Sequence, residues 1–160
     1  VSLIVEFLFS TLYHAIAAPR GKAVFRVLDH CGIYLLIAGS YAPFSLVTLA
    51  ERGGLMLCCA VWAVAVVGIV AECLLRERQP AWLTAVIYVL MGWLVVFHVG
   101  DLWQLLPPPA FWLLLAGGLS YTVGAVLYAI KKVPYLHFVF HLFTLAGSVC
   151  ITLSALLFVV

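Results

Sequence analysis

The sequence predicts an all-α fold, a polytopic bundle of transmembrane helices that forms a single domain over residues 1–160. Hydrophobic residues make up 67% of the chain and charged residues only 9%, which is too few to cover the surface of a soluble domain. The hydrophobic residues fall into six runs, each close to the roughly 20 residues that a helix needs to cross a bilayer. Strands are excluded because open strands leave backbone groups without partners in lipid, and because the runs are too long for barrel strands.

Three helices are predicted in the first half of the chain, at residues 1–18, 28–49 and 55–75. Prolines and glycines, which break helices, follow these runs at Pro19 and Gly21, at Gly53 and Gly54, and at Pro80. The chain begins inside the first run, at Val1 and not at a methionine, so we expect the true N-terminus to be missing.

Three further helices are predicted at residues 80–99, 110–130 and 135–160. The prolines at positions 107 to 109 separate the first two of these runs, and Pro134 precedes the last. All of the connections are short, so each helix is expected to run antiparallel to the one before it.

The basic residues predict which connections face the cytoplasm. Seven of the eight Lys and Arg residues fall in alternate connections, namely Arg20, Lys22, Arg26, Arg76, Arg78, Lys131 and Lys132. The other two connections hold Arg52, offset by Glu51, and the acidic Asp101. Because cytoplasmic loops carry an excess of Lys and Arg, the three basic connections are expected to share the cytoplasmic side.

The net charge and the cysteines bear on two further possibilities, nucleic-acid binding and a role for cysteine in disulfides or metal sites. The formal net charge is +2 and there is no basic run, so the sequence gives no support for nucleic-acid binding. The five cysteines form no CxxC pair and lie in or near apolar runs, where cysteine usually acts as a small hydrophobic residue. We expect none of them to form a disulfide or to bind a metal.

Three histidines and one aspartate are predicted to lie at the same depth, near the cytoplasmic side. His137 and His141 are four residues apart, so they lie on one helical face. His14 is near the cytoplasmic end of the first helix, and Asp29 opens the second helix on that side. Three neutral imidazoles with an open fourth position are a common catalytic arrangement for zinc. Asp29 is then expected to contact the zinc-bound water or to orient a ligand, with Ser10 supporting it one turn before His14.

Each of these residues also has a simpler interpretation. The two histidines of the last helix could serve packing, His14 could interact with the membrane interface, and Asp29 could cap a helix N-terminus. His30 is expected to lie at the membrane interface or beside the ligands without being one, and His98 is expected to lie on the opposite side of the membrane, apart from the site. Glu6 shares a face with Ser10 and His14, and is expected either to be a buried, protonated carboxyl or to face a polar cavity leading to the site.

Three motifs resemble those of the bacterial hemolysin III proteins, which belong to the superfamily of the adiponectin and progestin receptors. They are Ser10-Thr-Leu-Tyr-His14, the stretch from Leu28-Asp29 through Gly32-Ile33 to Pro43-Phe44, and His137-Phe-Val-Phe-His141. The resemblance implies a seven-helix bundle with a cytoplasmic N-terminus, of which this chain supplies helices two to seven. It also implies a zinc ion held by His14, His137 and His141, with Asp29 on the zinc-bound water and Ser10 as the serine of the first motif.

The resemblance leaves three functions open. The first is a zinc-dependent hydrolase of a membrane lipid amide, similar to ceramidases, in which Asp29 acts as general base. The second is a regulator or receptor of membrane state in which zinc ties helices together. The third is a pore-forming cytolysin, which the sequence favours least because no helix carries a polar stripe long enough to line a pore. We expect membrane lipids as partners and the bacterial inner membrane as the location.

Overall fold

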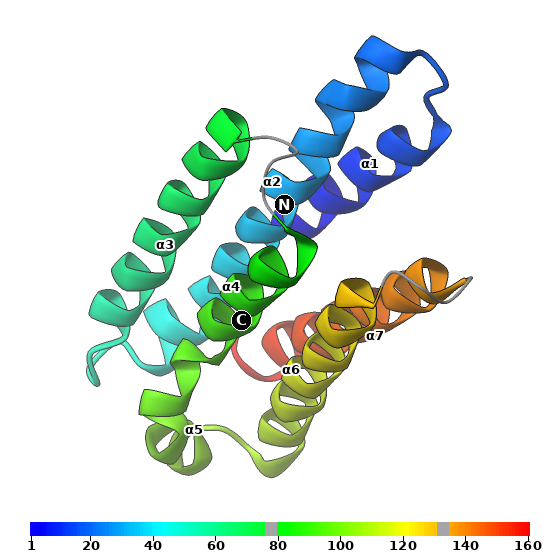
Figure 1. Ribbon diagram of the computed structural model, residues 1–160. Helices are drawn as coiled ribbons and strands as arrows, with labels where there is room; N and C mark the ends of the chain where they lie inside the picture. The colour runs from blue at the N-terminus through cyan, green and yellow to red at the C-terminus, as the bar shows by residue number, and fades with distance from the viewer. Residues whose placement is uncertain (76–79, 131–134) are drawn as a thin grey trace.

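The computed structural model describes residues 1–75, 80–130 and 135–160, and every regular element in these ranges is helical (Figure 1). The chain begins with α1 (Ser2–Ala15) and α2 (Pro19–Pro43), which continues as the π-helical segment η1 (Phe44–Thr48). There follow α3 (Gly54–Leu75), α4 (Ala81–Gly92), the 3-10 segment η3 (Trp93–His98) and α5 (Val99–Leu105). The last two helices are α6 (Pro108–Ala129) and α7 (Leu136–Phe158). The predicted all-α class is confirmed.

Five stretches of the described chain are long and apolar enough to cross a membrane, which makes this a multi-pass membrane protein. They are Pro19–Thr48, Gly54–Leu75, Trp82–Leu105, Pro108–Ala129 and Leu136–Phe158. The predicted runs 55–75, 110–130 and 135–160 agree with three of these stretches to within a few residues. The first run gives α1, an apolar helix of 14 residues that is shorter than a full span.

The second helix begins at Pro19, nine residues before the predicted start at 28. The span from Pro19 to Thr48 has 30 residues. At about 1.5 Å per residue it is about 45 Å long, well beyond the roughly 30 Å of the hydrocarbon core. The first turns of this long helix carry Arg20, Lys22 and Arg26. The prediction that these three residues lie in a loop was wrong, because hydropathy marks where a helix enters lipid and not where the helix begins.

The span predicted at residues 80–99 is also longer in the structure, where it covers Trp82–Leu105. Its helix changes type in the middle. The α-helix ends at Gly92, and six residues of 3-10 helix follow. The Tyr41 hydroxyl of α2 donates to the Gly92 carbonyl at 2.6 Å and accepts from the Val95 amide at 3.0 Å. Backbone groups in lipid need internal partners, so Tyr41 supplies partners where the α-helical pattern is interrupted. Asp101, predicted in a loop, lies in α5 and accepts a 2.7 Å hydrogen bond from Arg52.

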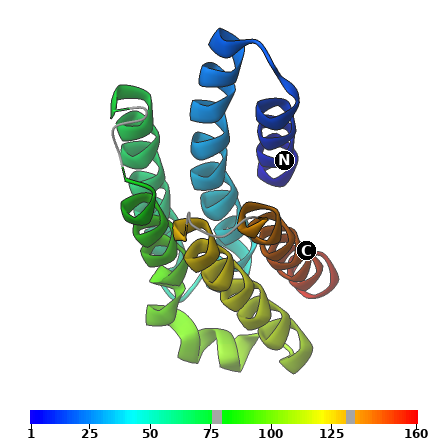
Figure 2. The same ribbon diagram turned by 45° about the vertical axis from the view of Figure 1, so that its right-hand side comes forward.

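The helices pack mainly against their sequence neighbours. α1 lies along α2, α2 along α3, and α6 along α7, and α4 also packs on α6 (Figures 1 and 2). α6 and α7 approach each other closely at Gly117 and Gly147. A Cβ on Gly117 would lie 3.1 Å from the Gly147 carbonyl oxygen, and a Cβ on Gly147 would lie 3.0 Å from that of Gly117. The two glycines thereby fix α7, and the histidines at its start, against α6.

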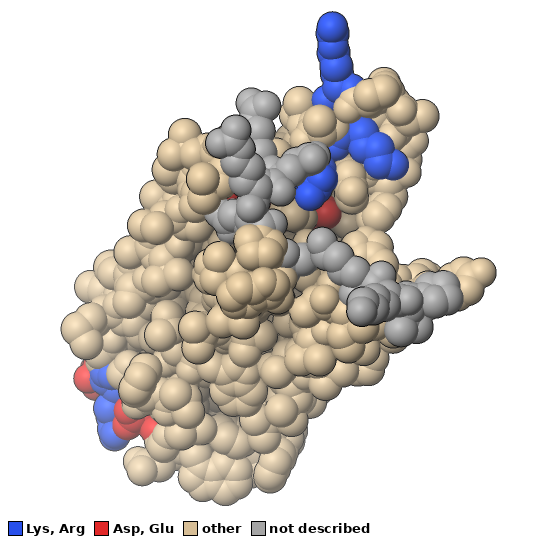
Figure 3. Space-filling model, in the orientation of Figure 1, with Lys and Arg blue, Asp and Glu red and all other residues tan. Residues whose placement is uncertain are grey.

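Charged side chains gather at the two ends of the molecule and leave an apolar surface between them. Figure 3 shows one group of Lys and Arg where α1 meets α2, and a smaller group of both signs at the opposite end. Large apolar side chains are exposed along the helices between these ends, among them Met56, Val67 and Leu74 of α3. Arg76, Arg78, Lys131 and Lys132, on which the predicted sidedness also depends, lie outside the described residues.

Candidate metal centre

Three histidines from the first and last helices converge at one end of the bundle. His14 is in the last turn of α1, and His137 and His141 occupy the first two turns of α7. The Nε2 atom of His137 lies 3.3 Å from that of His14 and 3.1 Å from that of His141. The ligand atoms of the three residues all lie within 4.8 Å of one another. Across the described part of the chain, no other group of three or more His, Cys, Asp or Glu residues meets that condition.

The donor set fits a zinc ion. Two neutral imidazoles share one hydrogen bond only when one donates, so three Nε2 atoms at these distances cannot all be satisfied by one another. When each ring carries its proton on Nδ1, three lone pairs point to a common centre, which is the arrangement that zinc ligation uses. His14 and His137 are exposed and His141 is half-buried, so a fourth position would be open to water or substrate.

Asp29 lies near the histidines, and Ser10 lies near Asp29. The Asp29 side chain is buried, and its carboxyl interacts electrostatically with His14 and His137. Ser10 of α1 is also buried, and it is among the side chains that interact with that carboxyl. Asp29 stands in the third turn of α2, whose N-cap residue is Ala18, so the alternative interpretation of Asp29 as a helix cap was wrong.

A polar cavity of about 150 Å³ lies next to the histidines. Two of the three histidines, His137 and His141, line it, together with six other side chains that can form hydrogen bonds: Glu6, Tyr13, Arg26, Asp29, His30 and Tyr128. Glu6 is 4% exposed and also lines this cavity. The two positions predicted for its carboxyl, buried and facing a polar cavity, therefore do not exclude each other. The site therefore offers two carboxyl groups near the imidazoles.

An apolar cavity of about 160 Å³ adjoins the polar one, between α2, α4, α6 and α7. Ile33, Tyr128 and Phe140 line both cavities, so these three side chains lie between the two spaces. The rest of the apolar cavity is lined mainly by aliphatic and aromatic side chains. Together the cavities offer a polar end at the histidines and an apolar end in the middle of the bundle.

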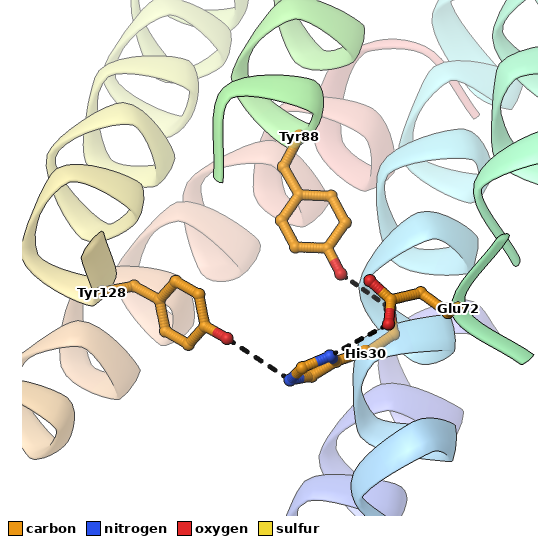
Figure 4. Close-up of polar contacts among 4 residues, drawn as sticks. All are labelled: His30, Glu72, Tyr88 and Tyr128. Carbon is orange, nitrogen blue, oxygen red and sulfur yellow. Dashed lines mark hydrogen bonds and ion pairs between the residues drawn. The ribbon is translucent and has the colours of Figure 1, made fainter. Parts of the chain in front are cut away.

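The sequence interpretation missed a polar group beside the cavity, which four helices build (Figure 4). His30 of α2 places Nδ1 3.3 Å from Oε2 of Glu72, which is on α3. Its Nε2 lies 3.3 Å from the Tyr128 hydroxyl of α6, and the Tyr88 hydroxyl of α4 donates to its carbonyl at 2.9 Å. In the sequence, Glu72 is the one residue that could have pointed to this group, because a carboxylate near the end of an apolar run usually has a functional reason to be there.

His98 lies at the other end of the molecule, near Asp101.

Comparison with known proteins identifies relatives along the whole chain. The family model described as "Haemolysin-III related" matches residues 1–152. The protein named Hemolysin-3 from Bacillus cereus is 40% identical over 159 residues, which cover 99% of this chain and 72% of that protein. The Hemolysin-3 homolog of Bacillus subtilis (strain 168) is 38% identical over 160 residues, which cover 100% of this chain and 75% of that protein. No solved structure matches the chain.

Proposed function

This chain belongs to the haemolysin III family, and from that premise we propose that it is a zinc-dependent hydrolase of a membrane lipid amide. The observation that carries the proposal is the convergence of three Nε2 atoms beside a buried carboxyl, next to a polar cavity that shares three lining side chains with an apolar one. His14, His137 and His141 hold the ion in this proposal. Bound there, zinc would lower the pKa of a water molecule to about 7 and polarise a carbonyl.

Asp29 is the residue that we assign to proton transfer from the attacking water. Its carboxyl is buried and faces His14 and His137, so it is within the site without taking the place of a ligand. Ser10, on the α1 side, would help to orient this carboxyl. A carboxylate held in this way accepts a proton as water adds to the carbonyl carbon, which is general base catalysis.

The two adjoining cavities support a lipid as the substrate. An acyl chain would occupy the apolar cavity, and the amide bond would then lie near Asp29 at the polar end. Burial of each methylene of such a chain contributes about 0.8 kcal/mol to binding. A soluble polar substrate would gain nothing from this apolar space, whereas an N-acyl lipid such as a ceramide matches both ends.

The exposed histidines favour catalysis over the alternative in which zinc has only a structural role. Structural zinc sites usually have four protein ligands, whereas catalytic sites keep one position open. The described residues supply three ligands, two of them exposed. A structural role predicts that chelation lowers the melting temperature while no substrate is turned over.

We further propose that the protein lies in the bacterial inner membrane with the histidines toward the cytoplasm. Arg20 and Lys22 are exposed at the end of the bundle that holds His14, in agreement with the positive-inside rule. Green fluorescent protein fused after Leu75 should then fluoresce, because that fusion point lies on the cytoplasmic side. A fusion after Leu105 should be dark, and the reverse pattern would contradict this orientation.

The function is tested with the full chain in lipid nanodiscs supplied with zinc. Release of fatty acid should be measured from ceramide and from a simple N-acyl alkylamine. Zinc content should be measured on the same samples. Asp29→Asn should bind zinc and lose hydrolysis, and His141→Ala should lose both. Hydrolysis that persists at the wild-type rate in both variants would contradict the proposal.

A further inference from the structure

We propose that His30 is a second catalytic residue, the general acid that protonates the leaving nitrogen, and that the buried carboxyl of Glu72 positions its ring. This inference rests on the proposed hydrolase function and assigns a role that zinc and Asp29 do not fill. Hydrolysis of an amide needs a proton on the departing amine, because an amide anion is a very poor leaving group. The cavity therefore needs an acid as well as a base.

The position of the imidazole satisfies the first requirement for such an acid. His30 lines the same polar cavity as His137, His141 and Asp29, so a substrate bound there would touch it. His30 follows Asp29 directly in the chain, and about 100° of helical rotation separates neighbouring side chains. The two groups therefore face the cavity from different directions, as an acid and a base on either side of a scissile bond must.

Glu72 orients the ring and makes its charged form tolerable. Nδ1 of His30 lies 3.3 Å from Oε2 of a carboxyl that is only 1% exposed. A carboxyl that holds Nδ1–H leaves Nε2 to point toward the reaction, as in other histidine–carboxylate pairs. When the carboxyl is ionised, its charge compensates that of an imidazolium whose Nδ1 lies 3.3 Å away. An imidazolium can thus form here without the cost of an unpaired buried charge.

The second oxygen of Glu72 supports a role beyond packing. Oε1 is buried and has no hydrogen-bond partner among the described residues. Leaving a buried carboxyl oxygen without a partner is costly, and a role in catalysis is one of the reasons for which such a group is kept. A pair that served only to join α2 to α3 would be expected to satisfy both oxygens.

Tyr128 occupies the position that the leaving nitrogen would take. Its hydroxyl lies 3.3 Å from Nε2 of His30, and its side chain lines both cavities, where the acyl chain and the amide would meet. Both contacts of the ring are slightly longer than strong hydrogen bonds, which is usual for catalytic groups before substrate binds. Tyr128 therefore holds the ring until the substrate nitrogen replaces its hydroxyl.

The reaction balances with these groups. Water adds to the carbonyl carbon and gives one proton to the Asp29 carboxylate. The carbon–nitrogen bond then breaks, its electron pair stays on nitrogen, and Nε2 of His30 gives that nitrogen a proton. The products are a carboxylic acid and an amine. Transfer of the proton from Asp29 to His30 through water in the cavity restores both groups.

A comparison of leaving groups tests the role of His30. The substrates are an N-acyl alkylamine and a 4-nitrophenyl ester with the same acyl chain, because nitrophenolate leaves without protonation. His30→Gln should lower kcat/KM for the amide by about 100-fold or more and for the ester by much less. Glu72→Gln should show the same pattern with a smaller loss. Asp29→Asn should slow both substrates, and the matched control His98→Gln, at the far end of the bundle, should change neither.

The outcomes separate this inference from the function on which it rests. Equal losses on both substrates in His30→Gln, or no loss on either, would overturn the role of His30 while hydrolysis stands. If the wild-type protein hydrolyses neither substrate, the proposed function and this inference both fall. Zinc content and melting temperature must be measured for every variant, so that a loss due to misfolding is recognised.

A spectroscopic measurement provides a readout that does not depend on turnover. In protein labelled with ¹⁵N-histidine, the resonances of His30 are identified by their absence in His30→Gln. Glu72→Gln should shift the Nδ1 resonance, because the partner of this nitrogen changes from a carboxylate to an amide. An unchanged resonance would show that Glu72 does not position the ring.

Discussion

The carboxyl oxygen Oε2 of Glu6, on α1, lies in the space beside Gly32 of α2 that a Cβ atom would fill. The Glu6 backbone is also close, since its Cα would lie 3.3 Å from that Cβ. α1 and α2 therefore approach closely here because residue 32 has no side chain. This explains the glycine in the motif that follows Asp29, and it shows how the position of α1, which carries His14, depends on α2.

Gly32→Ala should destabilise the protein by about 1–3 kcal/mol, because the added methyl group forces α1 away from α2. The displacement should also weaken zinc binding through His14. Thermal unfolding and zinc titration in nanodiscs measure the two effects. Gly118→Ala is the matched control, since a Cβ at Gly118 meets no atom within 4 Å. A Gly32→Ala protein as stable as this control would contradict the prediction.

Removal of one of the three histidines should strongly lower the affinity for zinc. Loss of a residue that only supports a metal ligand typically costs roughly 10–100-fold, and loss of a ligand should cost more. His14→Ala and His137→Ala should both purify with little zinc, while His98→Ala should retain it. Metal analysis of the purified proteins checks this directly. Full zinc occupancy in His14→Ala would show that α1 supplies no ligand.

Asp29→Asn should separate metal binding from catalysis. The amide keeps the size of the side chain and its contact with Ser10, so zinc should remain bound. The carboxylate that accepts a proton is lost, so kcat should fall about 10²–10⁴-fold. Ser10→Ala should show a smaller loss. An Asp29→Asn protein that loses its zinc instead would indicate that Asp29 maintains the site and does not act in the reaction.

Tyr41→Phe should destabilise the bundle by about 1–3 kcal/mol, because it leaves the Gly92 carbonyl and the Val95 amide without their partner in a lipid-surrounded segment. Chemical denaturation in mixed micelles measures the change in free energy of unfolding. Tyr135→Phe removes the same hydroxyl from a side chain that is 84% exposed, and should have little effect. Equal stabilities for the two variants would rule out this role of Tyr41.

Hydropathy and charge predicted most of the fold, and motif spacing predicted the candidate site. The histidine pair of α7 shares a face because of its four-residue spacing, and the structure brings His14 and Asp29 to it. Hydropathy could not reveal that α2 begins at Pro19, because a helix that leaves the bilayer no longer needs apolar residues. The pairing of His30 with Glu72 was also missed, since it joins two helices whose rotation about their axes no single sequence pattern specifies.

The histidines at the mouth of the cavity also have a consequence for the topology of the chain. His14 and His137 are 123 residues apart in sequence. An ion bound to both would join the first helix to the last and close a loop of that length. In the chain-entropy description, a cross-link across about 100 residues lowers the entropy of the unfolded chain by the equivalent of about 4.7 kcal/mol. The metal would then be a removable cross-link, and the supply of zinc would decide whether the first and last helices are joined.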